Sequence, residues 1–509
     1  MRNRGGKKNM ELTIRQQEGL RIAVERYHNR EPYTVISGYA GAGKAQPIET
    51  IIPTPNGKKK IGELKIGDYV FDRLGKPTKV LGIYPQGKRK KYEITLADGR
   101  KTICADDHLW SYYTSRGNLN TKTTQEMLNS GLRNSSGFKY KIPNNQAVEY
   151  PKQEFIIDPY MMGVFLGDGC CKERYLTLSS ETDEIPKNIG EIIGAIPYKS
   201  SINNYSWTFE WIEHTETVKW NNSNRIEERK KPKTIDYFQP YEKYLLCYAQ
   251  EKDIPPEYKL GSIQQRLELI QGLLDTDGSI SQHDQNRFNI RFTSTSIKLV
   301  QSLQEILYSL GYASTITEDN RNEKYTNEIC YGLNINIPNE EKYKLFRLKR
   351  KKDIAEKAKE FHKHKDYNKI SIIDIQPLQE EAEMVCIYVE NDEHLYLTND
   401  YIVTHNTTLV KFIIAALDLN PEKDVAYVAF TGKAATVLSK KGNPNAMTAH
   451  KLLYTARQKS DGTFFFIPNP LGSLEYKVIV LDECSMLPKG MWDRLLSHGV
   501  YVIACGDPA

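Results

Sequence analysis

The sequence predicts a protein of several domains: an α/β domain at the two ends of the chain, split by a long β-rich block that contains an α+β domain of its own. Three observations predict this fold class. Apolar strand-like runs alternate with helical patterns in 1–44 and 407–509. Short strands separated by Asp-Gly, Asn-Gly and Gly-Lys turns fill 45–155 and 365–406. Between these regions, one helical pattern ending in Asp-Gly occurs twice.

Length and composition are those of a large globular chain. A chain of 509 residues corresponds to three or four domains, and an apolar fraction of 39% suits such domains. No window approaches the roughly 20 apolar residues of a membrane span, and the basic start leads into no apolar signal core. The eight cysteines show no metal-binding spacing, so we expect reduced thiols and a cytoplasmic protein.

The net charge of +6 is modest, but the basic residues are clustered. The segment 347–365 holds nine Lys and Arg against three acids, and 229–233 is a second basic run. Such runs are either solvated faces or contacts with the DNA backbone.

The strongest local signal is a glycine-rich loop that is broken in two. Its first part contains Gly38, Gly41 and Gly43 and ends at Lys44, and the sequence resumes after 362 residues at Thr407. Joined, the parts read G-x-x-x-x-G-K-T, the phosphate-binding loop. Residues 1–44 and 407–509, together 147, amount to about one domain.

The split domain has the pattern of a doubly wound parallel sheet. Strand-like runs occur at 35–36, 425–430, 478–481 and 500–504, and helical patterns lie between them. Strands that alternate with helices predict a parallel sheet covered on both faces.

The residue types at the ends of these strands suit ATP and Mg²⁺. Backbone amides of the loop would hold the phosphates, and Lys44 would add charge at the β- and γ-phosphates. The Thr407 hydroxyl and Asp482 would hold Mg²⁺, and Glu483 would be the base for the attacking water. Alone, Asp482-Glu483 is an ordinary acidic pair at a turn, but the upstream loop favours the catalytic interpretation.

These flanking segments resemble superfamily 1 helicases of the RecD/Dda type. The resemblance depends on Leu12-Thr13-x-x-Gln16, the split loop and the motifs at 430–435, 448–450, 482–486 and 506–508. It implies that Gln16 contacts adenine and that ATP drives unwinding or translocation on DNA. The family's third motif and second motor domain have no counterpart here, so we expect nucleotide binding after the loop is joined, without unwinding.

The interrupting block, 45–406, ends as an intein does. His405 and Asn406 precede Thr407. The resemblance to inteins implies that Asn406 cyclises with help from His405 and that Thr407 takes over the acyl group. Splicing by this chemistry needs no cofactor.

Further intein motifs lie inside the block. Residues 96–108 resemble the activating-histidine motif and make His108 the activating residue, with Ala105 where Thr or Ser is usual. Cys386 stands where the family carries Asp or Cys and often aids the first steps, and His394 belongs to the C-terminal motifs. The family's Hint-type splicing fold is all-β, which assigns it to 45–155 and 351–406.

Ala45 departs from the intein pattern, because a methyl group cannot attack the Lys44 carbonyl. Either a natural Cys or Ser has been replaced, or this is a rarer intein in which the downstream Thr407 attacks directly. The alcohol of Thr407 is a poor nucleophile for an unactivated amide. We therefore favour a replacement and expect that Ala45 blocks splicing.

The repeated helical pattern lies at 160–169 and 270–278, and each copy has an internal glycine. Two such helices can pack at their glycines and place Asp168 and Asp277 side by side, where paired carboxylates would hold Mg²⁺ for phosphodiester hydrolysis. The copies resemble LAGLIDADG homing endonucleases, which implies an α+β domain, assigned to 156–350, that binds double-stranded DNA. Lys259 or Lys298 would be the accessory basic residue.

These signals predict a monomeric self-splicing precursor with a DNA-cleaving domain whose target is the uninterrupted helicase gene. One alternative is an ATPase with a regulatory or DNA-binding insertion that is never removed. A second is a DNA-binding module with silent aspartates. An insertion between the lysine and threonine of a phosphate loop argues against a permanent insertion, because it abolishes phosphate binding.

Overall fold

The structure is a computed structural model. The chain forms two compact units, one made of 1–143 with 369–509 and the other of 144–368. No helix in the described ranges is long and apolar enough to cross a membrane. The described residues are 14–37, 45–114, 117–135, 137–170, 177–200, 205–211, 215–219, 226–230, 240–245, 247–284, 287–319, 329–361, 366–391, 393, 395–405, 413–414, 416–440, 445–458, 463–482 and 484–506.

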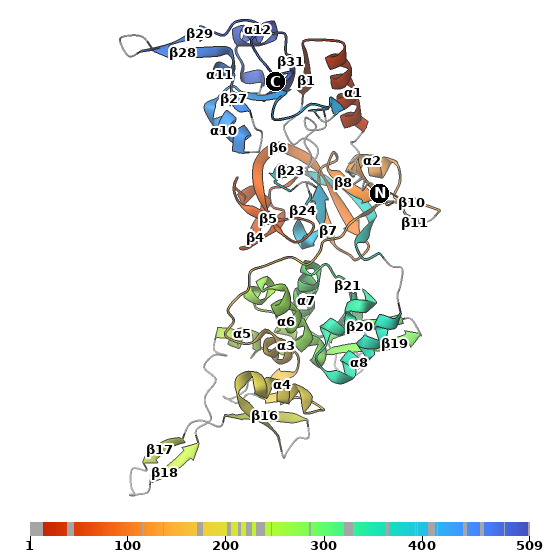
Figure 1. Cartoon of the computed structure of the whole chain (residues 1–509). Coiled ribbons are helices and arrows are strands. Elements are labelled where there is room, and N and C mark those ends of the chain that lie inside the picture. The colour runs from red at the N-terminus through yellow and green to blue at the C-terminus, as the bar shows by residue number, and fades with distance from the viewer. Residues whose placement is uncertain are drawn as a thin grey trace, which may run out of the picture. The chain divides into compact units, whose positions relative to one another are not determined.

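The two ends of the chain build one five-stranded parallel sheet (Figure 1). The N-terminal strand pairs with the C-terminal strand from Tyr33 opposite Val502 to Ser37 opposite Gly506. The four strands expected from the apolar runs are confirmed, and the sequence missed a fifth. In sheet order the strands are β1 (Tyr33–Ser37), β31 (Tyr501–Gly506), β30 (Val478–Asp482), β26 (Val425–Ala429) and β27 (Ala446–Thr448).

Helices cover both faces of this sheet. On β26, Val425 and Tyr427 pack in a core with residues of α1 (Ile14–His28) and α10 (Gly432–Lys440). Ala426 and Val428 point the other way, into a core with α11 (Ala449–Leu453) and α12 (Lys489–Ser497). Alternate residues of one strand are therefore buried on opposite faces, as a doubly wound sheet requires. A hairpin, β28 (Tyr454–Gln458) with β29 (Phe464–Pro468), projects from this domain.

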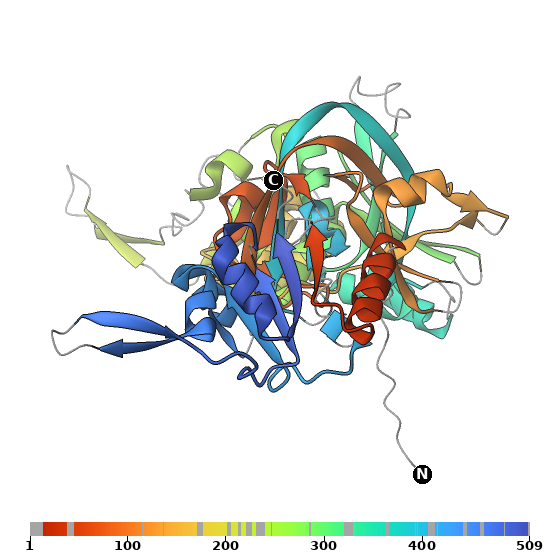
Figure 2. The ribbon, with the colours of Figure 1, turned by 90° about the horizontal axis from the view of Figure 1, so that it is seen from above.

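The two outer parts of the interrupting block form a β domain built on two long strands, β6 (Pro77–Leu96) and β23 (Lys369–Val389). They pair antiparallel with several register shifts and run side by side as a curved ribbon (Figure 2). Their sheet has eight strands: β5 (Tyr69–Phe71), β6, β23, β12 (Lys141–Pro143), β8 (Leu109–Tyr113) and β9 (Leu119–Thr123), with β2 (Gln46–Pro47) on β23 and β7 (Lys101–Cys104) on β6.

Shorter elements complete the β domain. The hairpin β24 (Leu395–Leu397) with β25 (Val403–His405) carries the end of the block. The helix α2 (Thr124–Asn129) begins at a capping box. In it the Thr123 hydroxyl accepts a hydrogen bond from the Glu126 amide, and the Glu126 carboxylate accepts one from the Thr123 amide. The shorter strands are β3 (Ile51–Thr54), β4 (Gly57–Lys60), β10 (Arg133–Asn134) and β11 (Gly137–Phe138).

The unit 144–368 consists of two similar α+β halves. Each half begins with one copy of the repeated helix, α3 (Pro159–Asp168) or α6 (Ile263–Thr276), followed by a four-stranded antiparallel sheet and a helix packed with it. The first sheet is β13 (Gly169–Cys170), β14 (Thr177–Ser179), β16 (Ser206–Trp211) and β15 (Ala195–Lys199), with α4 (Glu184–Ile193). The second is β19 (Gly278–Asp284), β20 (Arg287–Ser294), β22 (Cys330–Asn336) and β21 (Ala313–Asp319), with α7 (Ile297–Ser309) and then α8 (Lys349–Lys357).

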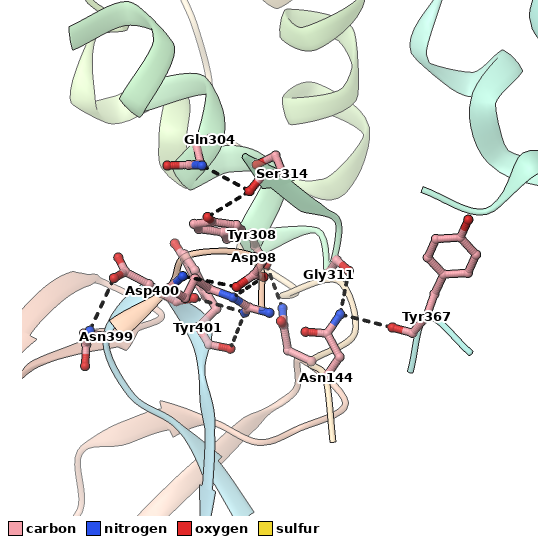
Figure 3. A network of polar contacts seen from close by, with 12 residues as sticks. Asp98, Asn144, Gln304, Tyr308, Gly311, Ser314, Tyr367, Asn399, Asp400 and Tyr401 are labelled. Carbon is pink, nitrogen blue, oxygen red and sulfur yellow. Dashed lines mark hydrogen bonds and ion pairs between the residues drawn. The ribbon is translucent and has the colours of Figure 1, made fainter. Parts of the chain in front are cut away.

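This unit is wider than the 156–350 expected from the motifs. The chain leaves the splicing sheet at Pro143 and returns at Lys369, and these two residues are register partners in β12 and β23. Asn144 donates its side-chain amide to the carbonyls of Gly311 and Tyr367, so the linker belongs to the inserted unit (Figure 3). Insertion between two adjacent strand ends leaves the splicing sheet intact.

Candidate functional site

The helices α3 and α6 touch through their glycine backbones. A Cβ on Gly163 would lie 2.2 Å from the Leu269 carbonyl oxygen, and a Cβ on Gly272 would lie 2.2 Å from the Tyr160 carbonyl oxygen. Only glycine permits so close an approach of two helices. The predicted packing of the repeated segments at their glycines is therefore confirmed.

This packing brings Asp168 and Asp277, the residues at the two helix ends, near each other. A Cβ on Gly167 would lie 3.4 Å from the Asp277 carboxylate. Loss of hydration within the surrounding protein raises the pKa of Asp277 to about 7, and the charge of Asp168 adds to this shift, although Asp277 keeps exposed surface. The pKa of Asp168 is also raised, chiefly by burial.

Two crowded carboxylates that repel each other are a donor set that suits a hard divalent cation. A cation relieves the repulsion, because it replaces the proton that this pair would otherwise retain. Within the described ranges no group of three His, Cys, Asp or Glu side chains gathers around a possible metal position. Further oxygen ligands would come from the backbone, water or DNA.

Two lysines that the sequence analysis did not select face the aspartates. Lys252 Nζ donates to the carbonyls of Leu166 and Gly167 at the end of α3, at 2.9 Å each. Lys351 Nζ donates to four carbonyls at the end of α6, the shortest of which is that of Gly278 at 2.6 Å. The charges of both lysines oppose the upward pKa shifts of Asp168 and Asp277.

The two lysines expected from the sequence lie elsewhere. Lys259 pairs with Glu305 at 3.3 Å, and Lys298 is at the start of α7. Burial lowers the pKa of Lys351 to about 8, even though the neighbouring carboxylates favour its charged form. Lys252 and Lys351 are therefore the better candidates for the accessory basic role.

The basic run at 347–365 is only partly available to DNA. Arg347 lies over the Tyr160 ring, and its Nε donates to Gln271 at 2.7 Å. Lys351 is buried at α6 as described, whereas Lys349 and Arg350 are exposed. Arg347 and Lys351 are thus engaged in contacts within the unit, which leaves the exposed Lys349 and Arg350 as candidates for contact with the DNA backbone; 362–365 lie outside the described residues.

In the β domain, position 45 is buried against the middle of the long ribbon. Ala45 is 1% exposed, and it packs with Ala105 and Met384. Its carbonyl accepts a hydrogen bond of 3.0 Å from the Ala105 amide. The strand that follows pairs Gln46 with Val385. Ala45 directly precedes β2, and an extension of this antiparallel register by one residue would set position 45 opposite Cys386.

Cys386 is the cysteine that this register brings to the splice junction. It is buried in β23, and its thiol donates to the Ile387 carbonyl at 3.6 Å. The other buried cysteine of this domain, Cys104, contacts the Thr124 hydroxyl, and burial raises the pKa of its thiol to about 12.

His108 is buried beside the same junction. Its Nε2 shares a hydrogen bond of 2.6 Å with the Thr404 hydroxyl, and its ring lies 4.9 Å from that of Trp110. The Thr124 amide donates to the His108 carbonyl and fixes its backbone. Position 105 is occupied by Ala105, and the hydroxyl that contacts His108 is that of Thr404, one residue before His405.

Several predicted site residues lie outside the described residues. In the splicing site these are Asn406, Thr407, His394 and the side chain of His405, whose backbone belongs to β25. In the nucleotide site, Asp482 ends β30 as expected. The rest of that site, Gly38, Gly41, Gly43, Lys44, Thr407, Glu483 and the side chain of Gln16, is outside the described residues.

Two family models match parts of the chain. A model described as a LAGLIDADG-like domain matches 264–347, which contain the second repeated helix and its sheet. A model described as an AAA domain matches 404–509. One segment is thus similar to LAGLIDADG-like domains and another to AAA domains, a combination consistent with an intein-containing helicase.

Two curated proteins are similar to parts of the chain. Replicative DNA helicase DnaB of Mycobacterium intracellulare is 27% identical over 400 residues, covering 74% of this chain and 60% of the relative. At least half of that alignment falls in the interrupting block, because the flanking segments hold only 147 residues (1–44 and 407–509). An uncharacterized protein of Methanocaldococcus jannaschii is 30% identical over 169 residues, 31% of this chain. The chain spans 60% and 18% of these relatives' own lengths.

Solved structures of two kinds are similar to parts of the chain. The gp41-1 intein is 31% identical and covers 16% of this chain and 61% of its own, with a TM-score of 0.14. A mesophilic variant of the homing endonuclease I-DmoI is 13% identical and covers 41% and 97%, with a TM-score of 0.21. TM-scores this low lend no weight to a fold assignment, which depends instead on the elements described above.

Proposed function

We propose that the chain is a splicing precursor in which 45–406 excise themselves and join Lys44 to Thr407, with Cys386 as the first nucleophile. The observation that supports this proposal is the β2–β23 register of Gln46 with Val385, which, extended by one residue, brings Cys386 opposite position 45. The expectation that Ala45 blocks splicing assumes a nucleophile at position 45. The register offers a thiol from the neighbouring strand instead.

The proposed first step forms a thioester. Cys386 Sγ attacks the Lys44 carbonyl carbon, the Lys44–Ala45 bond breaks, and the thiol proton ends on the freed Ala45 amine. We assign the transfer of this proton to His108, whose contact with the Thr404 hydroxyl supports a fixed orientation of the imidazole. A thiol is a better nucleophile toward an amide than the alcohol of Thr407.

The remaining steps use the C-terminal residues. Thr407 Oγ attacks the thioester, which releases the Cys386 thiol and leaves an ester. The Asn406 side-chain nitrogen then attacks its own carbonyl carbon and breaks the Asn406–Thr407 bond. The freed Thr407 amine attacks the ester carbonyl, so that an ordinary Lys44–Thr407 peptide bond forms and the Thr407 hydroxyl is restored.

The test follows the mass of the purified chain over time. We expect a joined product of 147 residues (1–44 with 407–509) and an excised block of 362 (45–406). Cys386→Ala should abolish both products. Cys330 is a buried cysteine of the inserted unit, and Cys330→Ala is the control that should leave both products unchanged. If the parent is inert and Ala45→Cys alone restores splicing, then Ala45 is a block and Cys386 is not the first nucleophile.

We further propose that the inserted unit cuts double-stranded DNA with Mg²⁺. Asp168 and Asp277 would hold the metal, which supplies Lewis-acid activation of the scissile phosphate. In this proposal Lys252 and Lys351 hold positive charge beside that phosphate, and the exposed Lys349 and Arg350 contact the phosphates of the DNA backbone. The natural target is the uninterrupted gene across the Lys44–Thr407 codons, because the interruption destroys that sequence in its own gene.

The joined flanking domain is proposed to bind ATP and Mg²⁺ through the restored loop, Thr407 and Asp482, as part of a cytoplasmic DNA helicase. The parallel sheet and the AAA-domain match support this function. The experiment titrates a fluorescent ATP analogue against the precursor and against the joined 147-residue product. Equal affinity in both would contradict the proposal.

A further inference from the structure

A buried ion pair closes the hairpin between β6 and β7. Arg100 Nε contacts Asp98 Oδ2 at 2.8 Å, and the two side chains are only 2% and 5% exposed. The Arg100 amide also donates to Asp98 Oδ1 at 3.1 Å. A buried pair of this kind is weak evidence for stability, because both ions lose hydration, and its best-attested use is to fix one arrangement.

The guanidinium reaches a turn 300 residues further along the chain. Arg100 donates to the carbonyls of Asp400 at 3.3 Å and Tyr401 at 3.4 Å. Figure 3 shows Asp98 facing the turn at Asp400 and Tyr401. Both turn residues are left-handed, with φ of 52° and 58°, a conformation that residues other than glycine rarely adopt. Two successive left-handed residues persist only where their surroundings hold them.

This turn decides where the C-terminal splice strand begins. Ile402 follows it, and β25 then carries Thr404, which contacts His108, and His405. Asn406 is the next residue, and its cyclisation requires a fixed approach of its side chain to its own carbonyl. A shift of the turn would therefore displace every group that acts at the C-terminal junction.

We propose that Arg100 is a positioning residue for cleavage at Asn406: the Asp98–Arg100 pair holds the left-handed Asp400–Tyr401 turn and thereby sets the place of β25. The inference builds on the proposed splicing function. It does not depend on Cys386, since cleavage at Asn406 needs no acyl transfer at Lys44.

The experiment measures two rates on the full chain. One is release of 407–509 by cleavage after Asn406, and the other is release of 1–44 by hydroxylamine attack on the thioester. Arg100 meets Asp98 through Nε and the two carbonyls through Nη1, two donors held apart by the planar guanidinium, whereas a lysine ammonium gathers its donors at one point. We therefore expect release of 407–509 to fall at least tenfold in Arg100→Lys. Release of 1–44 stays within twofold, which also shows that the variant is folded.

Two further variants separate positioning of the turn from a general effect on the stability of the domain. Arg73→Lys is the matched control: it alters a bidentate pair of the same kind, with Glu393 in the same domain, that is partly exposed. We expect it to leave both rates unchanged. Asp400→Gly, introduced into Arg100→Lys, recovers part of the lost rate, because glycine adopts the left-handed turn without help.

Equal slowing of both rates in Arg100→Lys, or no slowing of either, would overturn the proposal. If 1–44 is never released but Arg100→Lys still slows release of 407–509, the Cys386 proposal fails and this one stands. If the parent never releases 407–509, both fail.

Discussion

Gly272→Ala tests whether the contact between α3 and α6 places the two aspartates. The new Cβ would meet the Tyr160 carbonyl oxygen at 2.2 Å and the Val164 amide nitrogen at 2.7 Å, both backbone atoms that cannot rotate away. Ordinary van der Waals contacts begin at 3.4 Å, so the helices must separate by on the order of 1 Å, and a misplacement of about 1 Å in a catalytic constellation costs roughly 100-fold in rate. Overpacking of a core costs about 1–3 kcal/mol.

The assay pairs cleavage of a plasmid carrying the uninterrupted junction with thermal unfolding. We expect Mg²⁺-dependent cleavage to fall about 100-fold, while the unfolding temperature of the inserted unit falls by roughly 2–4 °C for each kcal/mol lost. Gln264→Ala, an exposed position on the same helix, is the matched control and changes neither quantity. Full cleavage by folded Gly272→Ala would refute the idea that helix spacing positions Asp168 and Asp277.

Four further outcomes are expected. Lys351→Gln lowers the cleavage rate at least tenfold while DNA affinity, measured by fluorescence anisotropy, stays within twofold; an equal loss of both would mean a role in binding. Because folding raises the pKa of Asp277 to about 7, a proton must leave before Mg²⁺ binds, so calorimetry should show weaker Mg²⁺ binding at pH 6 than at pH 8. For the same reason the metal-free unit should have a larger free energy of unfolding at pH 6 than at pH 8, since a carboxyl with a raised pKa binds its proton more tightly in the folded state. Replacing 144–368 by a short loop between the register partners Pro143 and Lys369 should leave splicing intact; loss of splicing in a folded product would contradict the independence of the two units.

Local patterns were enough to predict most elements of the fold. The strands β26, β30 and β31 contain continuous apolar runs, and such runs bounded by turns predict buried parallel strands. The glycines of the repeated helices predicted their contact, because a helix interior rarely keeps glycine without a packing reason. The hairpin β28–β29 was missed because its residues are exposed throughout, so no alternation of buried and exposed positions marks it.

The groups that complete the sites could not be read from the sequence. Lys252 and Lys351 reach the ends of α3 and α6 from distant segments, and the sequence offers Lys259 and Lys298 with equal plausibility. Cys386 meets position 45 only through the register of strands about 340 residues apart. Such a register depends on bulges in the long ribbon, and β23 has several against β6.

The sheet of the flanking domain is already assembled across the interruption, and this has a consequence for splicing. Beyond the β1–β31 ladder, the Tyr501 hydroxyl donates to the Ala23 carbonyl at 2.8 Å and contacts the Thr34 hydroxyl at 2.6 Å. These contacts join the N-terminal segment to the C-terminal one independently of the bonds that splicing breaks. An N-terminal segment released at Lys44 therefore stays docked on its partner, and its high effective concentration favours ligation over escape. Segments cleaved at both junctions but not ligated should accordingly elute together in size-exclusion chromatography, and separate elution would show that the ladder alone does not hold them.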